Sequence, residues 1–395
     1  MKFVIYGLPC AGKDYLLSMM PFIQHIKGSA WLNAQCNNKF RELSSEEQND
    51  LRRQFIKHIN SIETENVIVD GHYAFPDNGG YRLAFTDSDG DSYDVFIYLD
   101  TPADVIHERI QSSEKNTIYS HLTVSDLQAW RDYEVSGLFE EALRRGKEFI
   151  LLDNDIDSIV KFMKGLADGS VLTAPQVSRI NADKVISAAS GKTRIILSDG
   201  DKTLTVEDLT KSVSIPEELK VHHVFQGDRY TTYQFWKVRQ PYASLNDLDD
   251  RYAPALSNVH FDESILKDLS KIDGLKVIVT AGLEDLWSKA ATVSGVMDMA
   301  VGSKTNGLSN MSQLGKAYLC RYLEDAGFQV IALGDNMVDY YMLMEASKGY
   351  VIAHAKKNSS LQKTVLAGTK LKQPSYNQVK FDGVEEVVSI HDDLE

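Results

Sequence analysis

The sequence has few cysteines, no long apolar run and no excess of positive charge. Its three cysteines, Cys10, Cys36 and Cys320, are widely spaced, which predicts neither a disulfide framework nor a cysteine metal cluster. No segment approaches the ~20 apolar residues that a membrane-spanning helix needs, and the first residues read as a strand instead of a signal peptide. We therefore expect a cytoplasmic protein without a membrane partner.

The charge balance is acidic. The chain has 42 basic and 56 acidic residues among 395, a formal net charge of −14. This balance disfavours nonspecific binding to long nucleic acids, although it leaves room for a local basic groove. With 43% hydrophobic residues the chain can bury ample core, and its length exceeds the usual size of one domain. We expect two soluble domains.

Apolar strands alternate with longer mixed segments along the chain. Strands separated by helix-sized segments predict parallel sheets. We expect the α/β class, with two doubly wound parallel-sheet domains: residues 1–165, a linker at 166–192, and residues 193–395. The expected strands are residues 2–6, 66–70, 94–99, 148–152, 194–199, 276–280 and 329–333.

Two carboxylates, Asp199 and Asp201, follow an apolar strand and are separated by Gly200. Open α/β sheets bind their ligands at the carboxyl ends of the strands. There, Asp199 would be able to attack a phosphorus atom and form an aspartyl-phosphate. Asp201 would act as general acid toward the leaving group and then as general base toward water, with Thr203 orienting the bend. By itself, an Asp-Gly-Asp run is equally consistent with a turn or a calcium loop.

Three later segments favour the catalytic interpretation. A second apolar strand ends at Thr280, where a hydroxyl can hold a phosphate oxygen. Lys316 follows near an expected helix start, and a third apolar strand is followed by Asp335 and Asp339. Each segment alone has an ordinary explanation, since a lone lysine is usually a solvated surface residue. Their joint occurrence in this order indicates one phosphate site.

These four segments resemble the four motifs of the haloacid dehalogenase superfamily of phosphohydrolases, over roughly residues 190–390. The resemblance implies that Asp199 is the nucleophile, that Asp201 is the acid/base, and that Thr280 binds the phosphoryl group. An acid at position 201 is typical of the phosphatases and phosphotransferases of this superfamily, because its dehalogenases lack it. The runs that begin at Asp199 and Gly334 look most like the phosphoserine-phosphatase branch.

The same resemblance implies a magnesium site. Asp335 would bind Mg²⁺ together with Asp199 and the backbone carbonyl of Asp201. Lys316 would neutralise the charge that develops on the phosphoryl group, and Asp339 would orient Lys316 or support the metal. Both cations are needed because a carboxylate must approach a phosphate dianion.

A long interval separates the first two motifs. Asp199 and Thr280 are 280 − 199 = 81 residues apart, more than a crossover helix and a short loop require. In the resembled family an insertion here is a cap of the C1 type that closes over the site, and we place it at about residues 206–270. This segment is aromatic and partly basic, which fits a small helical core. Alternatively, Arg229, Lys237 or Arg239 binds a second anionic group of the substrate.

A second phosphate signature lies near the start of the chain. The first strand runs into Gly7-Leu8-Pro9-Cys10-Ala11-Gly12-Lys13-Asp14, a Gly-x4-Gly-Lys pattern that precedes an apolar helical segment. This is the context of a phosphate-binding loop. Its backbone N–H groups would cradle the phosphates of ATP or another nucleoside triphosphate, with Lys13 reaching the β- and γ-phosphates. Asp14 replaces the Ser or Thr that usually ligates Mg²⁺, and the Gly-Lys-Asp run resembles the loops of some P-loop kinases of small phosphorylated molecules.

Two further residues fit a kinase-like domain. Asp70 ends an apolar strand and is a candidate second metal ligand or base. Arg109 lies in a helical segment where, in P-loop kinases resembling adenylate kinase, an arginine contacts the donor phosphates; the alternatives are Arg131, Arg144 and Arg145. The alternative interpretation makes Arg109 an exposed helical residue that pairs with Glu108 or Asp104. Arg41, Arg52 and Arg53 are candidates for holding the phosphoryl acceptor, although a surface helix explains them as well.

We expect a bifunctional enzyme: an Mg²⁺-dependent phosphatase for a small phosphorylated substrate, joined to an ATP-dependent kinase that acts on a small metabolite or nucleotide. The main alternative is end repair of nucleic acids, because the domain order resembles that of the bacteriophage polynucleotide kinase-phosphatases. A third interpretation makes the N-terminal domain a noncatalytic nucleotide sensor that regulates the phosphatase.

Overall fold

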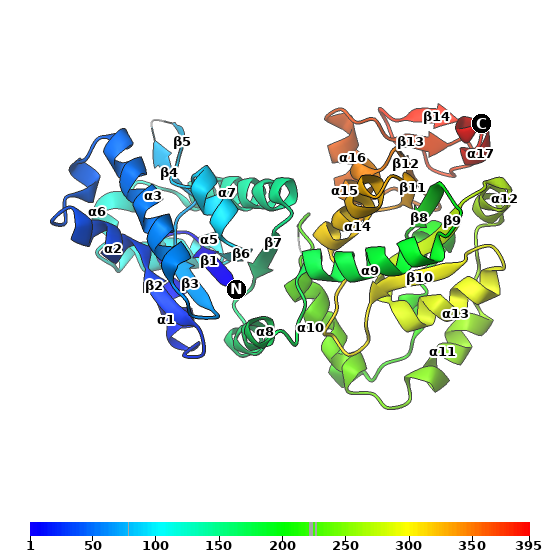
Figure 1. The fold of residues 1–395 in the computed structure, drawn as a ribbon, viewed down its shortest axis with the longest axis horizontal. Helices are drawn as coiled ribbons and strands as arrows, with labels where there is room; N and C mark the ends of the chain where they lie inside the picture. Colours follow the sequence, from blue (N-terminus) through cyan, green and yellow to red (C-terminus); the bar gives the residue numbers. More distant parts are fainter. Residues whose placement is uncertain (78, 221–223, 226) are drawn as a thin grey trace. The chain divides into compact units, whose positions relative to one another are not determined.

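The computed structural model describes residues 1–77, 79–220, 224–225 and 227–395, except for the side chain of Arg41. The chain forms two compact units, Met1–Ser170 and Val171–Glu395. Both are α/β with parallel central sheets, which confirms the expected fold class (Figure 1). Among the described residues, no helix combines the length and apolar character that crossing a membrane requires.

The N-terminal unit contains a five-stranded parallel sheet in the order β2-β3-β1-β6-β7. Strands β1 and β6 lie at its centre and are almost fully buried, as expected for parallel strands covered on both faces. Strand β2 is a polar edge strand without an apolar run, which explains why the sequence did not predict it. The strands are β1 (Lys2–Tyr6), β2 (Gln24–Lys27), β3 (Val67–Asp70), β6 (Val95–Leu99) and β7 (Glu148–Leu152).

Helices surround this sheet, and a hairpin extends from the chain after β3. Helix α3 begins with a capping box, in which the side chains of Ser44 and Glu47 each bond the other residue's backbone N–H. The hairpin pairs β4 (Ala74–Asp77) with β5 (Gly80–Leu83) in antiparallel register. The helices are α1 (Lys13–Ser18), α2 (Gly28–Gln35), α3 (Ser45–Ser61), α4 (Asp87–Ser92), α5 (Ala103–Gln111), α6 (Asn116–Tyr119), α7 (Val124–Arg145) and α8 (Ile156–Asp168).

The C-terminal unit contains a seven-stranded parallel sheet in the order β10-β9-β8-β11-β12-β13-β14. In β8, Ile195 and Leu197 belong to one hydrophobic cluster and Ile196 to a second one, because successive side chains point to opposite faces of a strand. The strands are β8 (Arg194–Ser198), β9 (Leu275–Leu283), β10 (Met299–Ser303), β11 (Gln329–Gly334), β12 (Lys348–Val351), β13 (Lys372–Pro374) and β14 (Glu385–Val387).

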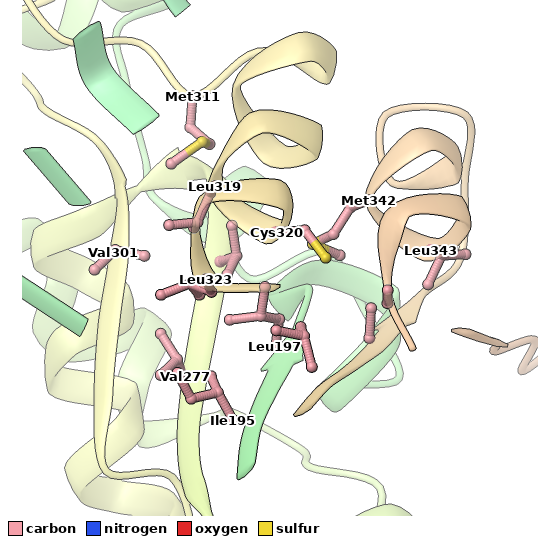
Figure 2. Close-up of a cluster of buried hydrophobic side chains, with 14 of the residues drawn as sticks. Ile195, Leu197, Val277, Val301, Met311, Leu319, Cys320, Leu323, Met342 and Leu343 are labelled. Carbon is pink, nitrogen blue, oxygen red and sulfur yellow. The ribbon is translucent and has the colours of Figure 1, made fainter. Parts of the chain in front are cut away.

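Figure 2 shows the first of these clusters, where β8 and β9 pack against α14 (Gln313–Asp325). The helices of the unit pack apolar side chains against both faces of the sheet. This packing holds the carboxyl ends of its strands in position. The remaining helices are α9 (Ala174–Ala188), α10 (Thr232–Ala243), α11 (Leu248–Ser257), α12 (Glu263–Lys271), α13 (Glu284–Ser294), α15 (Tyr340–Glu345), α16 (Ser359–Leu366) and α17 (Ile390–Leu394).

The segment predicted as a linker, residues 166–192, is folded. It contains the end of α8 and all of α9, and Val177 and Val185 of α9 are fully buried in the cluster that α14 completes. The mixed Ala and Ser composition that suggested a linker reflects close packing between two helices, in which Ser178 donates to the carbonyl of Gly315 at 2.7 Å. The two units therefore meet in sequence at Ser170 and Val171.

The insertion between β8 and β9 carries α10 and α11. An antiparallel bridge between Thr205 and Phe261 marks where the chain leaves the sheet layer and returns to it. The last part of the predicted insertion forms α12, whose Ile265 and Leu269 lie in the same hydrophobic cluster as Ile196 of β8.

Candidate functional site

The carboxyl ends of three neighbouring strands bring the C-terminal candidate residues together. Strand β8 lies between β9 and β11, and the three strands lead to Asp199, Thr280 and Asp335 respectively. This edge is where open α/β sheets bind ligands. Residues separated by more than one hundred positions in the sequence thus share one site.

Lys316 of α14 is the central cation of this site. Its Nζ donates to Asp199 Oδ1 at 2.5 Å and to Asp339 Oδ1 at 2.7 Å. Its side chain is 1% exposed, so the three charges interact with little water between them. Burial acts to lower the pKa of Lys316, but Asp199 and Asp339 outweigh it and raise the pKa above its usual value. Lys316 is therefore an ammonium group at neutral pH.

The second carboxylate oxygen of Asp339 accepts hydrogen bonds from backbone N–H groups. Oδ2 accepts from the backbone N–H groups of Asp335 and Asn336, at 3.2 and 3.4 Å. With Oδ1 on Lys316, both oxygens have partners, and the side chain is fully buried. This geometry favours the Lys316-orienting role over the metal-supporting role that was considered for Asp339.

Asp201 points toward the insertion. Its carboxylate accepts from the backbone N–H and the hydroxyl of Thr210, at 2.9 and 2.6 Å. Burial, with the nearby Asp208, raises the pKa of Asp201 to about 6. A carboxyl group with a pKa near neutrality can both donate and accept a proton at physiological pH, as acid/base catalysis requires.

Asp199 lies directly after β8 and is 5% exposed. Burial and the charge of Asp339 raise the pKa of Asp199, while Lys316 opposes the shift. Thr203 approaches from the following turn, with its Oγ1 3.5 Å from Asp199 Oδ2. Because Oδ1 binds Lys316, Oδ2 is the oxygen left to act as nucleophile.

Thr280 and Gly282 line the other side of the site. The Thr280 hydroxyl accepts from the backbone N–H of Gly282 at 2.7 Å, which leaves its proton free to point toward a phosphate oxygen. A Cβ on Gly282 would come within 2.8 Å of that hydroxyl and 2.5 Å of the Thr210 hydroxyl. Only glycine therefore fits between the strand end and the insertion.

The carboxylates fit a magnesium ion. Asp199, Asp335 and Asp339 offer oxygen atoms that lie within 4.8 Å of one another, and carboxylate oxygens are ligands that Mg²⁺ prefers. Burial and the neighbouring Asp339 raise the pKa of Asp335 to about 7, so a divalent cation would offset unfavourable charge there. With Asp339 engaged elsewhere, Asp199 and Asp335 are the side chains best placed to hold the ion.

Two supporting residues escaped the sequence analysis. Trp287 of α13 packs against the turn that contains Gly200, because a Cβ on Gly200 would lie 2.5 Å from its indole ring. His354 follows β12, and its imidazole lies between the carbonyl of Thr203 at 3.2 Å and the carboxylate of Asp262 at 3.3 Å. The polar residue after the apolar run Tyr350–Ala353 was the only sequence signal for His354, and Trp287 gave none.

The phosphate loop of the N-terminal unit connects β1 to α1. Gly7 and Gly12 have φ angles of 148° and 101°, a region that side-chain-bearing residues rarely adopt. Thr101 supports the loop by donating to the carbonyl of Ala11 at 2.7 Å. The two glycines of the Gly-x4-Gly-Lys pattern thus occur where the backbone turns.

Lys13 lies inside this loop. Its Nζ donates to the carbonyl of Gly7 at 2.6 Å and is 4.0 Å from Asp70 at the end of β3. Burial lowers the pKa of Lys13, and Asp70 partly opposes this effect. Burial likewise raises the pKa of Asp70. Strands β1 and β3 are neighbours, which explains why the loop and the carboxylate meet.

Asp14 forms an ion pair with Lys27 of β2, at 2.6 Å. Because the ammonium group of Lys27 accompanies it, the carboxylate of Asp14 adds less net negative charge beside the loop. Lys27 is in register with Asp70 across the β2–β3 pair. No sequence pattern indicated this role of Lys27, because its partner lies in a different element.

Among the arginine candidates, Arg109 contacts the loop. Its Nη1 donates to the carbonyls of Cys10 and Ala11 at 3.1 and 3.2 Å. Arg131 instead makes a bidentate pair with Asp100 at 2.8 and 2.5 Å, and Arg144 and Arg145 pair with acidic residues of α4 and α7. Arg109 also lines a cavity of about 1330 Å³ that includes the loop and Asp70.

Comparisons with known proteins give partial matches. A family model described as "AAA domain" matches residues 21–121, which follow the phosphate loop. A search of curated proteins found no match. Similar solved structures are a substrate-bound phosphoserine phosphatase complex (17% identity, 41% of this chain and 86% of that chain, TM-score 0.31), a phosphoaspartyl intermediate analogue of phosphoserine phosphatase (17%, 41%, 87%, 0.31) and apo phosphoserine phosphatase (18%, 41%, 86%, 0.31). TM-scores at this level do not establish a shared fold, so the function proposed below rests on the geometry of the sites.

Proposed function

We propose that the C-terminal unit hydrolyses a phosphomonoester through an aspartyl-phosphate at Asp199. The observation that carries this proposal is the buried ammonium group of Lys316, held between Asp199 and Asp339 at the carboxyl edge of the sheet. Hydrolysis of a phosphate dianion by a carboxylate nucleophile needs such a fixed positive charge. A magnesium ion held by Asp199 and Asp335 would supply further neutralisation of the phosphate oxygens.

The reaction has two steps. Asp199 Oδ2 attacks phosphorus while the bond from phosphorus to the ester oxygen breaks, and Asp201 gives its proton to that oxygen. Asp201, now a carboxylate, then takes a proton from water as the water oxygen attacks the phosphoaspartate, which releases inorganic phosphate and restores Asp199. The raised pKa of Asp201 supports both proton transfers.

Arg239 of α10 is the best candidate for contact with the rest of the substrate. It is 4% exposed, and its Nη2 donates to the carbonyl of Ala281, next to Thr280. Its Nε has no hydrogen-bond partner among the described residues. Lys237 of the same helix stands over the ring of Tyr233 instead, 5.7 Å from the ring centroid. We infer that Arg239 binds a second anionic group of a small substrate.

This inference about Arg239 is testable with paired substrates. Arg239→Gln is expected to raise KM by about tenfold for phosphomonoesters with an additional carboxylate or phosphate, because one charged hydrogen bond is worth roughly 1.5–3 kcal/mol. KM for a phosphomonoester with an uncharged leaving group is expected to change little. Lys237→Met is the matched control on α10. Equal KM changes for both substrates would contradict the inference.

We propose further that the N-terminal unit transfers phosphate from ATP. Support comes from the loop glycines, the buried Lys13 beside Asp70, and the contact of Arg109 with the loop. The loop amides would bind the triphosphate, Lys13 would face the β- and γ-phosphates, and Asp70 would serve as metal ligand or base. Lys27 beside Asp14 keeps the substitution at this position compatible with a bound triphosphate.

Two variants separate the proposed activities. Asp199→Asn is expected to abolish phosphate release from phosphomonoesters and leave ATP binding intact, whereas Lys13→Ala is expected to abolish ATP consumption and leave the phosphatase intact. ATP binding without turnover in the wild type would identify a sensor instead of a kinase. A substrate screen that includes a 3′-phosphorylated oligonucleotide tests end repair, because Asp199-dependent release from that substrate alone would favour it over a small substrate.

A further inference from the structure

The N-terminal cavity extends well beyond the phosphate loop. Its volume is about 1330 Å³, whereas pockets for one drug-sized ligand measure roughly 300–1,000 Å³. Its lining includes the loop, Arg109 and Asp70. It also includes side chains of α3, of the β4–β5 hairpin and of α4, and we call the part of the cavity that these three elements line its far end. There is room for a second molecule beside the nucleoside triphosphate.

One face of α3 contributes a basic and an aromatic side chain to the lining of this far end. Gln48, Arg52 and Phe55 recur at intervals of four and three residues, which places them on the same side of the helix, and all three line the cavity. Arg53 does not line it. Arg53 is exposed and pairs with Asp50. Only one of the two adjacent arginines is therefore available to a ligand.

No ion pair joins Arg52 to an acid of the described residues, although the charge of Asp89 acts on it from farther away. Its Nη1 donates to Asn49 Oδ1 at 2.8 Å, and its guanidinium lies 5.3 Å from the ring centroid of Phe40. Among the described residues no carboxylate is within ion-pair distance of Arg52. Arg82 of β5 also lines this end of the cavity and has only a distant contact with Asp77, at 3.8 Å. Burial, with the charge of Arg82, lowers the pKa of Arg52, so an anion between the two arginines would relieve an unfavourable charge.

The walls near these arginines are aromatic. Phe40, Phe55, Phe75, Phe85 and Tyr93 contribute to the lining. An aromatic wall favours a flat apolar group, and guanidinium groups favour phosphate. A nucleoside phosphate combines both features in one molecule.

We propose that the far end of this cavity binds the phosphoryl acceptor and that the acceptor is a nucleoside phosphate, with its phosphate between Arg52 and Arg82 and its base against the aromatic wall. This inference rests on the proposed kinase function and names its substrate class. In the transfer, the bond between the γ-phosphorus and the ADP oxygen breaks and an acceptor oxygen forms a bond to the same phosphorus. Any proton on that oxygen passes to Asp70.

Binding to the full chain tests this proposal without requiring turnover. Equilibrium dialysis compares a nucleoside 5′-monophosphate, the 3′-monophosphate and the free nucleoside, each with wild type, Arg52→Gln and Arg53→Gln. We expect a monophosphate to bind at least about tenfold more tightly than the nucleoside, and Arg52→Gln to remove that difference. Arg53→Gln is the matched control and is expected to bind like wild type. Equal binding of nucleoside and monophosphates, or an Arg52→Gln variant that binds like wild type, would overturn the proposal.

Turnover distinguishes this proposal from the kinase function itself. With labelled ATP, the binding nucleotide is expected to be phosphorylated, and Arg52→Gln is expected to raise its KM by about tenfold while KM for ATP stays within about twofold. A 5′-hydroxyl oligonucleotide is the second arm, and its phosphorylation in place of the free nucleotide identifies a nucleic-acid end as the source of the nucleoside phosphate. Lys13-dependent ATP turnover that no nucleotide stimulates would overturn the acceptor assignment and leave the ATP site standing. Absence of any ATP turnover would refute the kinase function instead, while the dialysis result still decides whether the far end binds a nucleotide.

Discussion

At the scale of single residues, the C-terminal site depends on one ammonium group that faces two buried carboxylates. Lys316 contacts both Asp199 and Asp339, and all three side chains are within 8% exposure. In such an environment each charge is tolerated because the others are present. Removal of the positive charge that we propose for binding a phosphate dianion is therefore also expected to destabilise the unit.

Replacement of Lys316 tests this double role. Lys316→Met is expected to abolish phosphatase activity and to lower the free energy of unfolding by about 3 kcal/mol, because it leaves a buried carboxylate pair without its counter-ion. Urea denaturation measures the change. Lys289→Met is the control, since Lys289 forms an exposed pair with Asp249 and its loss is expected to cost less than about 1 kcal/mol. Equal costs for the two variants would show that the buried pair contributes no more than a surface one.

The sequence predicted residues that the structure brings close together, but it did not predict all of their contacts. Asp199, Thr280, Lys316 and Asp335 each stand at the end of an apolar run or near a helix start, so the pattern of the chain reveals them. Whether Asp339 served Lys316 or a metal depended on where its two oxygens point, which only the tertiary structure decides. Residues without such a pattern, such as Trp287, were missed because their role comes from packing against a glycine in another element.

At the scale of elements, the sequence predicted the strands with long apolar runs, including the edge strand β7, and missed β2, β10, β12, β13 and β14. Strands β1, β6, β8 and β11 are runs of apolar residues because both faces of a parallel sheet are covered. Strand β2 and strand β14 are short, polar and partly exposed, so no periodicity marks them. Helix α9 was taken for a linker because small residues suit close helix packing as well as they suit a flexible connection.

Helix α7 contains a buried acid with a measurable effect on stability. Burial raises the pKa of Glu134 to about 7, and its Oε1 accepts from the backbone N–H of Ala74 at 3.0 Å. At pH values between the ordinary pKa of a glutamate and about 7, Glu134 keeps its proton in the folded state and has lost it in the unfolded state. The free energy of unfolding of the N-terminal unit is therefore expected to fall as pH rises through this window.

Glu134→Gln removes this titration. The variant is expected to lose the part of the pH dependence between about pH 4.5 and 7 that Glu134 causes, which amounts to about 3 kcal/mol. Urea denaturation at several pH values measures the slope. Glu140→Gln, an exposed position on the same helix, is expected to keep the wild-type slope. If Glu134→Gln also keeps it, Glu134 ionises in the folded protein as it does in the unfolded chain.

At the scale of the whole molecule, each of the two compact units buries apolar residues of its own, and the proposed function places a separate phosphate site in each. A ligand stabilises only the unit that binds it, by about 2.7 kcal/mol at one hundred times its Kd. At a constant magnesium concentration, addition of ATP is therefore expected to raise the thermal transition of the N-terminal unit alone, and this shift is expected to vanish in Lys13→Ala. Differential scanning calorimetry of the full chain measures both transitions. A shift of the C-terminal transition by ATP in Asp199→Asn as well as in wild type would contradict separate sites.

The covalent intermediate at Asp199 is the central claim, and trapping it is the most direct test. Wild-type protein is mixed with a phosphomonoester substrate and Mg²⁺, quenched, and treated with borohydride, which reduces an acyl phosphate to an alcohol. Mass spectrometry then locates the modified residue. We predict homoserine at position 199 that depends on substrate and is absent from Asp199→Asn. Reduction at another carboxylate, or an unmodified Asp199 during active turnover, would contradict the account.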